Sequence, residues 1–128
     1  MEISNGVEFM TDRRKKIGSW GEQFACDYLI QQGYKIIGRN VNTPHGEIDI
    51  LAKKGQNLIF IEVKTRTNYV FGYPEISLTP RKLSHMQNAA LFYLQENEFD
   101  GGWQLDAISI VKIGKNLPEI THFENVSP

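Results

Sequence analysis

The chain has only one cysteine, Cys26, among its 128 residues, so no disulfide can form within it, as is usual in a reducing compartment. No apolar run approaches the ~20 residues that a membrane-spanning helix needs. The first residues also lack the basic stretch and following apolar segment of a secretory signal. These absences predict a cytoplasmic protein with no membrane partner.

The chain also lacks an excess of charge of either sign. Its 14 lysines and arginines nearly balance its 15 aspartates and glutamates, so net charge neither supports nor excludes a nucleic-acid partner. The three histidines have no paired spacing that would indicate a zinc site. The length and the 41% hydrophobic content predict one domain at residues 15–128. Residues 1–14 have no clear hydrophobic period and are expected to form a flexible arm.

Two helices and several strands are predicted from hydrophobic periodicity. Trp20, Phe24 and Tyr28 recur at helical spacing, with Ile17 and Leu29 widening the stripe, and are expected to form one packed face of the first helix. Thr79 and Pro80 predict the start of the second helix, as N-cap and first helical residue. The expected helices are residues 17–32 and 80–96, and the expected strands are 34–39, 47–53, 58–66, 103–111 and 118–124, with 40–45 as a loop. This order predicts an α/β sandwich in which the helices cover a sheet.

The most informative segment is a predicted β-hairpin with a four-residue loop at residues 54–57. If Lys53 and Leu58 close this loop, Asp49 falls opposite Glu62, and the pleat places Lys64 on the face of Glu62. Two carboxylates held together repel each other. A divalent cation between them would turn this cost into a binding site.

These charges have two other interpretations. Asp49 and Glu62 could form a solvated acidic pair, or Lys64 could neutralise Glu62 or Glu47. The residues that precede Glu62 make both interpretations less favoured. Residues 58–61 are Leu-Ile-Phe-Ile, a run typical of a strand covered on both faces. Charges at the end of such a strand are costly unless they are paired or bind a metal, so the spacing favours a metal site.

The same residues carry a family resemblance. Asp49, twelve residues and then Glu62-Val63-Lys64 resemble the PD-(D/E)xK signature of the restriction-endonuclease-like superfamily. A fuller set of motifs resembles the YraN-like family, whose members are similar to archaeal Holliday junction resolvases. This set is Gly18-Ser19-Trp20-Gly21-Glu22, Gly33-Tyr34, Arg39-Asn40, Gly46-Glu47-Ile48-Asp49, residues 59–66, Phe71-Gly72, Lys82 and Asp106. The resemblance implies a restriction-endonuclease-like α/β fold with a central mixed sheet of about five strands.

The resemblance also implies roles for individual residues. Asp49 and Glu62 match metal ligands, Glu22 matches a further acidic residue facing the metal, and Lys64 matches the catalytic lysine. The implied cofactor is Mg²⁺ or Mn²⁺, the implied partner is DNA, branched by analogy with the resolvases, and a homodimer is expected. Residues 104–106 read Gln-Leu-Asp where the family commonly has Arg-Phe-Asp, which leaves a phosphate-binding role at this position in doubt.

Basic residues near the ends of elements are candidate contacts for a nucleic acid. Arg39, Arg66, Arg81 and Lys82 would form a positive rim around the acidic centre. Ordinary surface charge is the alternative for these residues. For the basic run at residues 13–16, a solvated helix start is the favoured interpretation over phosphate contact. Aromatic residues at 69, 71 and 73 would either stack on bases or cap the core.

Three functional hypotheses follow. The leading one is a metal-dependent DNA endonuclease that hydrolyses phosphodiester bonds, with Asp49, Glu62 and Lys64 as its catalytic residues. The second is a nucleic-acid-binding module that keeps the nuclease fold without catalysis. The third is a structural or protein-interaction role in which the charged hairpin is a network of salt bridges. Binding of Mn²⁺ separates the first from the third, and metal-dependent cleavage separates the first from the second.

Overall fold

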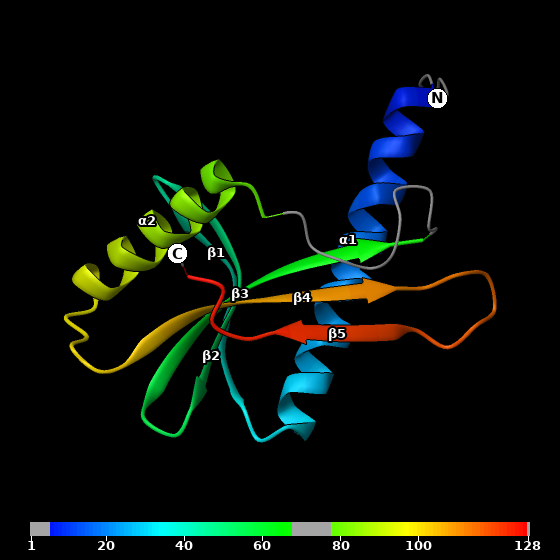
Figure 1. The fold of residues 1–128 in the computed structure, drawn as a ribbon. Coiled ribbons are helices and arrows are strands. Elements are labelled where there is room, and N and C mark those ends of the chain that lie inside the picture. The colour runs from blue at the N-terminus through cyan, green and yellow to red at the C-terminus, as the bar shows by residue number, and fades with distance from the viewer. Residues whose placement is uncertain (1–5, 68–77, 128) are drawn as a thin grey trace.

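The computed structural model describes residues 6–67 and 78–127, with side chains from residue 13 onward, as a five-stranded sheet and two helices (Figure 1). The elements are α1 (Gly6–Gln31), β1 (Lys35–Thr43), β2 (Gly46–Lys54), β3 (Asn57–Arg66), α2 (Pro80–Glu96), β4 (Trp103–Val111) and β5 (Glu119–Phe123). The strands lie in chain order. All neighbouring pairs are antiparallel except β3 and β4, which are parallel. The predicted α/β fold with a mixed five-stranded sheet is therefore confirmed.

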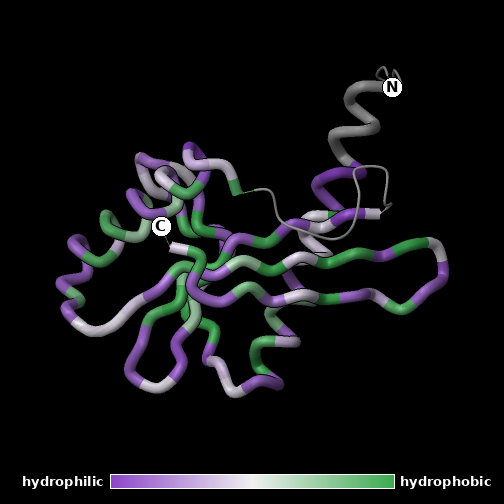
Figure 2. Tube along the Cα trace, in the orientation of Figure 1, coloured by the Kyte–Doolittle hydropathy of each residue, from purple (hydrophilic) through white to green (hydrophobic). Residues whose placement is uncertain are grey.

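The two helices cover opposite faces of the sheet, because successive residues of a strand point to opposite sides. On β3, Ile59 and Ile61 join a cluster with α1, whereas Leu58 and Phe60 join a cluster with α2. Hydrophobic segments recur along the strands (Figure 2). The apolar run before Glu62 is thus buried on both faces, as its composition predicted. Among the described residues, no helix combines the length and apolar character of a membrane span.

The β2–β3 hairpin has the predicted register but a tighter turn. Lys53 pairs with Leu58 and Ile50 pairs with Ile61. Lys54 also pairs with Asn57, which leaves only Gly55 and Gln56 in the loop. Gly55 has a φ of +61°, a conformation that glycine adopts without a steric cost. A two-residue turn matches the twist of its flanking strands, which explains why the predicted four-residue loop is wrong.

Strand β1 is longer than expected, and the predicted loop at residues 40–45 is wrong for most of its length. Val41 pairs with Ile48 and Thr43 pairs with Gly46 of β2. Only Pro44 and His45 separate the two strands. The polar composition of this segment indicated a loop, but β2 supplies partners for its backbone N–H and C=O groups, and this pairing decides the conformation.

Helix α1 differs from the prediction in its start and in its buried face. It begins at Gly6 rather than at residue 17, and the division of the chain at residue 14 stays a prediction. Leu29 of the predicted stripe is fully buried, and Phe24 and Tyr28 pack against the core as expected, whereas Trp20 is 40% exposed and Ala25, outside the stripe, is fully buried. A Cβ atom at Gly21 would overlap the hydroxyl of Thr65. Because α1 lies this close to β3, a tryptophan does not fit between them, and the small residues Gly21 and Ala25 face the sheet instead.

We expect Gly21→Ala to lower the free energy of unfolding by about 1–3 kcal/mol, the usual cost of overpacking, because the new methyl group collides with Thr65. Gly18→Ala is the matched control, since a Cβ there has no neighbour within 4 Å. It is expected to stabilise the helix by up to about 1 kcal/mol. Urea unfolding of both variants is the measurement. Thr65→Ala should restore part of the loss, and equal effects at Gly18 and Gly21 would contradict this account.

Candidate functional site

Asp49 sits where the hydrogen-bonded pairing between β2 and β3 ends. The paired register stops at Ile50 opposite Ile61. One residue further, Oδ2 of Asp49 accepts a hydrogen bond of 2.9 Å from the backbone N–H of Val63. The side chain thereby continues the connection between the strands in place of the backbone. Asp49 also lies within electrostatic range of Glu62, although the paired register ends before the two residues that were predicted to face each other.

The two carboxylates influence each other electrostatically. The pKa of Asp49 is raised from 3.8 to about 7, first by burial and then by the negative charge of Glu62. Glu22 adds a smaller increase in this pKa, and the N–H of Val63 opposes it. An ionised Asp49 is thus costly as long as no cation is present, because two negative charges share a partly buried region.

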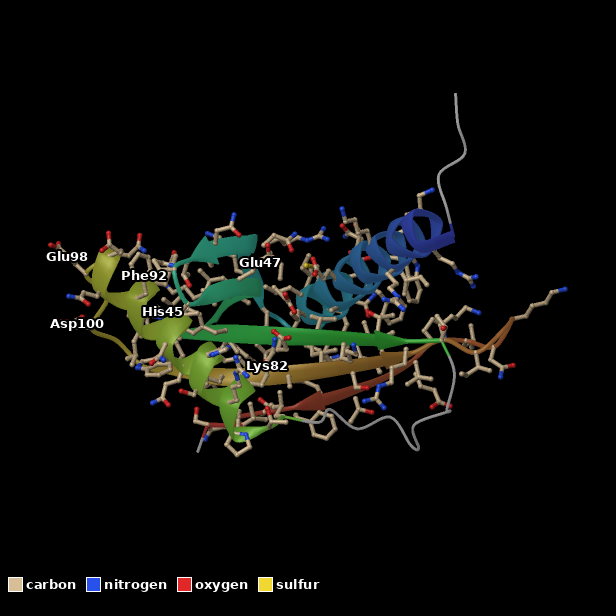
Figure 3. All side chains as sticks on the ribbon, turned by 90° about the horizontal axis from the view of Figure 1, so that it is seen from above. His45, Glu47, Lys82, Phe92, Glu98 and Asp100 are labelled. Atoms are coloured by element: carbon tan, nitrogen blue, oxygen red, sulfur yellow. The ribbon has the colours of Figure 1, made fainter. Side chains whose placement is uncertain are left out.

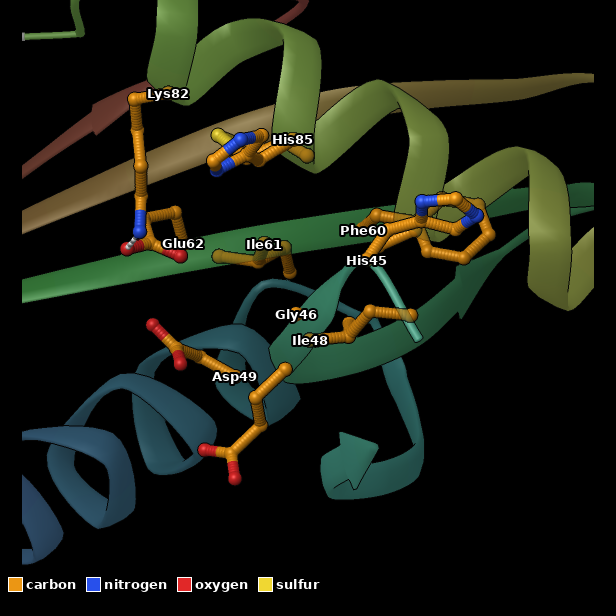
Figure 4. Close-up of a pocket in the computed structure, with 12 residues that line it drawn as sticks. His45, Gly46, Ile48, Asp49, Phe60, Ile61, Glu62, Lys82 and His85 are labelled. Atoms are coloured by element: carbon orange, nitrogen blue, oxygen red, sulfur yellow. Dashed lines mark ion pairs between the residues drawn. The ribbon is translucent and has the colours of Figure 1, made fainter. Parts of the chain in front are cut away.

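Lys82 reaches this region from α2. Thr79 caps the helix by accepting a hydrogen bond of 3.1 Å from the N–H of Lys82, and Pro80 is its first residue. Lys82 thus lies in the first turn, beside the sheet (Figure 3). Its Nζ is 2.8 Å from Oε1 of Glu62 (Figure 4). The hydrogen bond to Glu62 raises the pKa of Lys82, and burial partly opposes it. Lys82, which was expected at the positive rim of the site, therefore pairs directly with Glu62, a predicted metal ligand.

A cavity of about 90 Å³ separates the β1–β2 turn, β2 and β3 from α2. Asp49, Glu62 and Lys82 line it together with Glu47 and two histidines, His45 and His85 (Figure 4). His45 makes an edge contact with the ring of Phe92 on α2, with 6.2 Å between the ring centres. The cavity thus combines three carboxylates, one ammonium group and two imidazoles. Such a group of polar side chains can bind an ion or a phosphate, and apolar side chains such as Phe60 and Met86 complete the lining.

Glu22 and Arg39 form a second charged pair, between α1 and β1. Nη2 of Arg39 lies 3.7 Å from Oε1 of Glu22, and its Nη1 donates a 2.8 Å hydrogen bond to Gln23. Burial raises the pKa of Glu22, while Asn40 and Arg39 lower it. Nε of Arg39 is buried without a hydrogen-bond partner. Arg39, a predicted contact for nucleic acid, is thus engaged by α1.

Lys64, the predicted catalytic lysine, lies outside the 90 Å³ cavity. It is exposed and lines a separate cavity of about 350 Å³ together with Glu22 and Val63. Within the described part of the chain, no ion pair joins Lys64 to Glu62 or Glu47. The alternative in which Lys64 neutralises one of these carboxylates is therefore wrong for this structure, and Lys82 takes that position at Glu62.

The remaining predicted contacts lie apart. Arg66 ends β3, where its carbonyl accepts a 2.9 Å hydrogen bond from the N–H of Lys112. Arg81 is exposed in the first turn of α2. The aromatic residues at 69, 71 and 73 lie outside the described residues. The structure thus brings together Asp49, Glu62 and Lys82, places Glu22 within electrostatic range and leaves Lys64, Arg66 and Arg81 outside the cavity.

A buried polar network was not predicted. Asp106 is fully buried on β4 and accepts hydrogen bonds from Gln104 (2.8 Å) and from the N–H of Asn125 (2.9 Å). Its Oδ2 is 2.7 Å from Nε2 of His122 on β5, whose Nδ1 is 3.1 Å from the hydroxyl of Tyr28 on α1. These contacts engage both ring nitrogens of His122. Gln104 binds Asp106 directly. The signal available in the sequence was an aspartate inside a largely apolar strand.

Comparison with known proteins places the chain in a family. Residues 21–110 match the model of the family described as "Uncharacterised protein family UPF0102". A UPF0102 protein of Syntrophomonas wolfei is 42% identical over 113 residues, which cover 87% of this chain and 96% of the relative. Similar proteins of Geobacter metallireducens (39% identity, 91% and 95% covered) and Mycolicibacterium vanbaalenii (38% identity, 91% and 98% covered) carry the same family name. The matched range includes Glu22, Asp49 and Glu62, and the chain belongs to the UPF0102 family.

Proposed function

We propose that this UPF0102 protein is a metal-dependent DNA endonuclease of the restriction-endonuclease-like superfamily. The observation that carries the proposal is the juxtaposition of Asp49 and Glu62 beside one cavity, with the pKa of Asp49 raised to about 7. Strongly perturbed pKa values cluster at functional sites. The PD-(D/E)xK resemblance of the same residues supports the proposal independently.

The ligands at this site suit Mg²⁺ or Mn²⁺. Both ions take oxygen ligands, and Mg²⁺ is commonly held by one or two carboxylates and several waters. Asp49 and Glu62 supply such a pair. In residues 6–67 and 78–127, no three or more Asp, Glu, His or Cys side chains are grouped closely enough to enclose an ion. The fit is therefore to an open site completed by water and phosphate, with Glu22 as a third carboxylate nearby.

Each residue of the site has a separate role in the proposed reaction. Asp49 and Glu62 would hold the ion, and Val63 N–H keeps the Asp49 carboxylate in place. When bound, the ion neutralises charge on the scissile phosphate and acidifies a water molecule. Lys82 compensates the charge of Glu62. Lys64, exposed at the neighbouring cavity, stays the proposed residue for positioning the nucleophile or the phosphate.

A second candidate is a DNA-binding module that keeps this fold but does not cleave. The ion pair between Lys82 and Glu62 favours it, because an ammonium group already occupies one oxygen of the proposed metal ligand. The position of Lys64 outside the cavity favours it as well. Such a module would bind DNA at low salt and leave every substrate intact in the presence of Mn²⁺.

Cleavage of labelled flap, fork, four-way and linear DNA by the full chain tests the proposal. We expect cleavage with Mn²⁺ or Mg²⁺ and none with EDTA. Asp49→Asn is expected to lower the cleavage rate at least ~100-fold. Mutation of a residue that only hydrogen-bonds to a metal ligand commonly costs 10- to 100-fold in metal affinity or activity, and loss of a ligand itself should cost more. Asp100→Asn, at an exposed position beyond α2, should retain the rate. Cleavage that survives in Asp49→Asn would assign the activity to a contaminant, and DNA binding without any cleavage would favour the second candidate.

Three narrower expectations accompany the proposal. Branched DNA as the substrate rests on the analogy with junction resolvases. A homodimer is expected with it, because symmetric cutting of two strands requires two sites related by symmetry. A cytoplasmic location stays a prediction. The relative rates on the four DNA substrates and the mass of the protein in solution measure the first two.

A further inference from the structure

A basic groove runs between α1 and the end of β3, apart from the 90 Å³ cavity. It consists of two neighbouring cavities of about 350 and 330 Å³, and Ile17, Thr65 and Thr67 line both of them. We call it the α1–β3 groove and define it by Arg13, Arg14, Lys16, Trp20, Lys64 and Lys112. The N-terminal half of α1 extends beyond the sheet next to the end of β3 (Figure 1).

The charge of this groove is unusual for the chain. Five of its described lining residues are basic and only one, Glu22, is acidic, although the whole chain carries a net charge of −1. In the described part of the chain, none of the five basic side chains takes part in an ion pair. Unpaired cations gathered along one groove repel each other, and a polyanion placed there would relieve that repulsion.

Trp20 adds a second, independent feature. It is 40% exposed and lines the groove, and its ring stacks on Phe24 with 5.4 Å between the centres and an angle of 30°. The contact with Phe24 holds the indole in one orientation while leaving part of it open to solvent. A fixed, exposed aromatic ring among cations is the arrangement on which single-stranded nucleic acids stack their bases.

The groove also borders the acidic site. Val63 and Glu22 line its first cavity. Glu22 is the third proposed carboxylate, and the N–H of Val63 binds Asp49, although this cavity shares no lining residue with the 90 Å³ cavity. Gly21 permits this arrangement, because its lack of a side chain lets α1 approach Thr65 in the floor of the groove.

From these observations we infer that the α1–β3 groove binds one unpaired DNA strand, with phosphates at its basic side chains and a base stacked on Trp20. This inference rests on the proposed nuclease function for the choice of DNA as the polymer. It assigns a role to the basic run at residues 13–16, for which the sequence favoured a solvated helix start. A branched or flapped substrate would supply such an unpaired strand.

Binding of a fluorescent oligothymidylate of about 12 nucleotides, a length in the usual range for one binding module, tests the groove directly. The full chain is used in EDTA, so cleavage plays no part. Arg14→Gln combined with Lys16→Gln is expected to weaken binding about tenfold at low salt. It should also lower the slope of log affinity against log salt by about 1.4, since each phosphate contact on a single strand contributes about 0.7.

The matched control is Lys35→Gln combined with Lys53→Gln. It removes the same charge from a cross-strand pair between β1 and β2 that does not line the groove. We expect this variant to bind like the unmodified chain. Equal losses in the two double variants would overturn the inference, because the binding would then follow net charge alone. Tighter binding of duplex DNA or of RNA than of the single DNA strand would overturn it as well.

Trp20 is tested separately. Trp20→Ala should weaken binding about tenfold, whereas Trp20→Phe, which keeps a stacking ring, should stay within about threefold. Quenching of tryptophan fluorescence by the strand should disappear in Trp20→Phe, although Trp103 remains. Quenching that persists there would exclude stacking on Trp20. Circular dichroism confirms that each variant is folded.

The outcomes separate this inference from the proposed function. Asp100→Asn, at an exposed position that does not line the groove, should bind the DNA strand as tightly as the unmodified chain. If DNA binding is weakened by the groove variants but no substrate is cleaved, the nuclease proposal is rejected and the groove inference is kept. If cleavage depends on Asp49 but the affinity for the DNA strand does not change in the Arg14, Lys16 and Trp20 variants, the groove inference is rejected and the nuclease proposal is kept.

Discussion

Asp49→Asn is expected to abolish Mn²⁺ binding and, in the same variant, to stabilise the ion-free protein at neutral pH. The first effect follows from the loss of a direct ligand, for which we expect at least a ~100-fold lower affinity. The second follows because asparagine cannot add a negative charge beside Glu62. The amide oxygen can still accept the hydrogen bond from Val63 N–H, so the local structure is kept. Opposite effects on binding and stability distinguish a metal site from a structural pair.

The stability effect has a defined pH dependence. The pKa of Asp49 is raised from 3.8 to about 7 in the folded state, so the folded chain binds this proton more tightly than the unfolded chain does. The contribution to stability is fully present below about pH 4 and is lost as pH rises towards 7. The loss is on the order of 4 kcal/mol, since pKa values of 3.8 and about 7 differ by roughly three units and each unit corresponds to about 1.36 kcal/mol. The advantage of Asp49→Asn over the unmodified chain should therefore grow across this range.

Urea unfolding in EDTA at pH 5 and pH 8, together with calorimetric titration of Mn²⁺, measures both effects. Asp100→Asn serves as the control, because it makes the same chemical change at an exposed position beyond α2. It should alter neither the affinity for Mn²⁺ nor the dependence of stability on pH. Undiminished Mn²⁺ binding by Asp49→Asn would end the assignment of Asp49 as a ligand.

Asp106→Ala is expected to destabilise the fold by about 3–5 kcal/mol, the usual cost of removing one partner from a buried polar group. Asp106 is fully buried, and its removal leaves the hydrogen-bond donors of Gln104, Asn125 and His122 without an acceptor. These donors come from β4, β5 and the segment after β5. Urea unfolding at pH 7 is the measurement.

Ser109→Ala is the matched control for this prediction. Ser109 lies on the same strand and is also fully buried, but its hydroxyl has no hydrogen-bond partner. Removing an unpaired hydroxyl should leave stability within about 0.5 kcal/mol or raise it. Equal losses at Asp106 and Ser109 would show that burial alone, rather than the network, sets the cost.

Much of the candidate site could be predicted because its main members lie on one hairpin. The β2–β3 register follows from local pairing, so Asp49 and Glu62 meet as expected. The family prediction from the motifs is likewise confirmed for UPF0102. The position of Lys82 could not be predicted in this way, because it depends on how α2, the connection between β3 and β4, packs on strands β1, β2 and β3.

The errors in the predicted fold have a common cause. The aromatic stripe on α1 has the right helical period, but the close approach of Gly21 to Thr65 places small residues in the contact and leaves Trp20 exposed. The polar segment after residue 39 becomes a strand because β2 offers it hydrogen-bond partners. In both cases a tertiary partner overrode a local preference.

Alternation and turn chemistry in the amino-acid sequence were sufficient to determine the α/β class, the pairing of β2 with β3 and the meeting of two carboxylates, since these depend on neighbours in the chain. Only the tertiary structure decided that Lys82 rather than Lys64 pairs with Glu62, that Asp106 and His122 join in a buried network, and that the α1–β3 groove exists. These features arise between elements distant in sequence, where the packing of helices on a sheet sets which side chains meet.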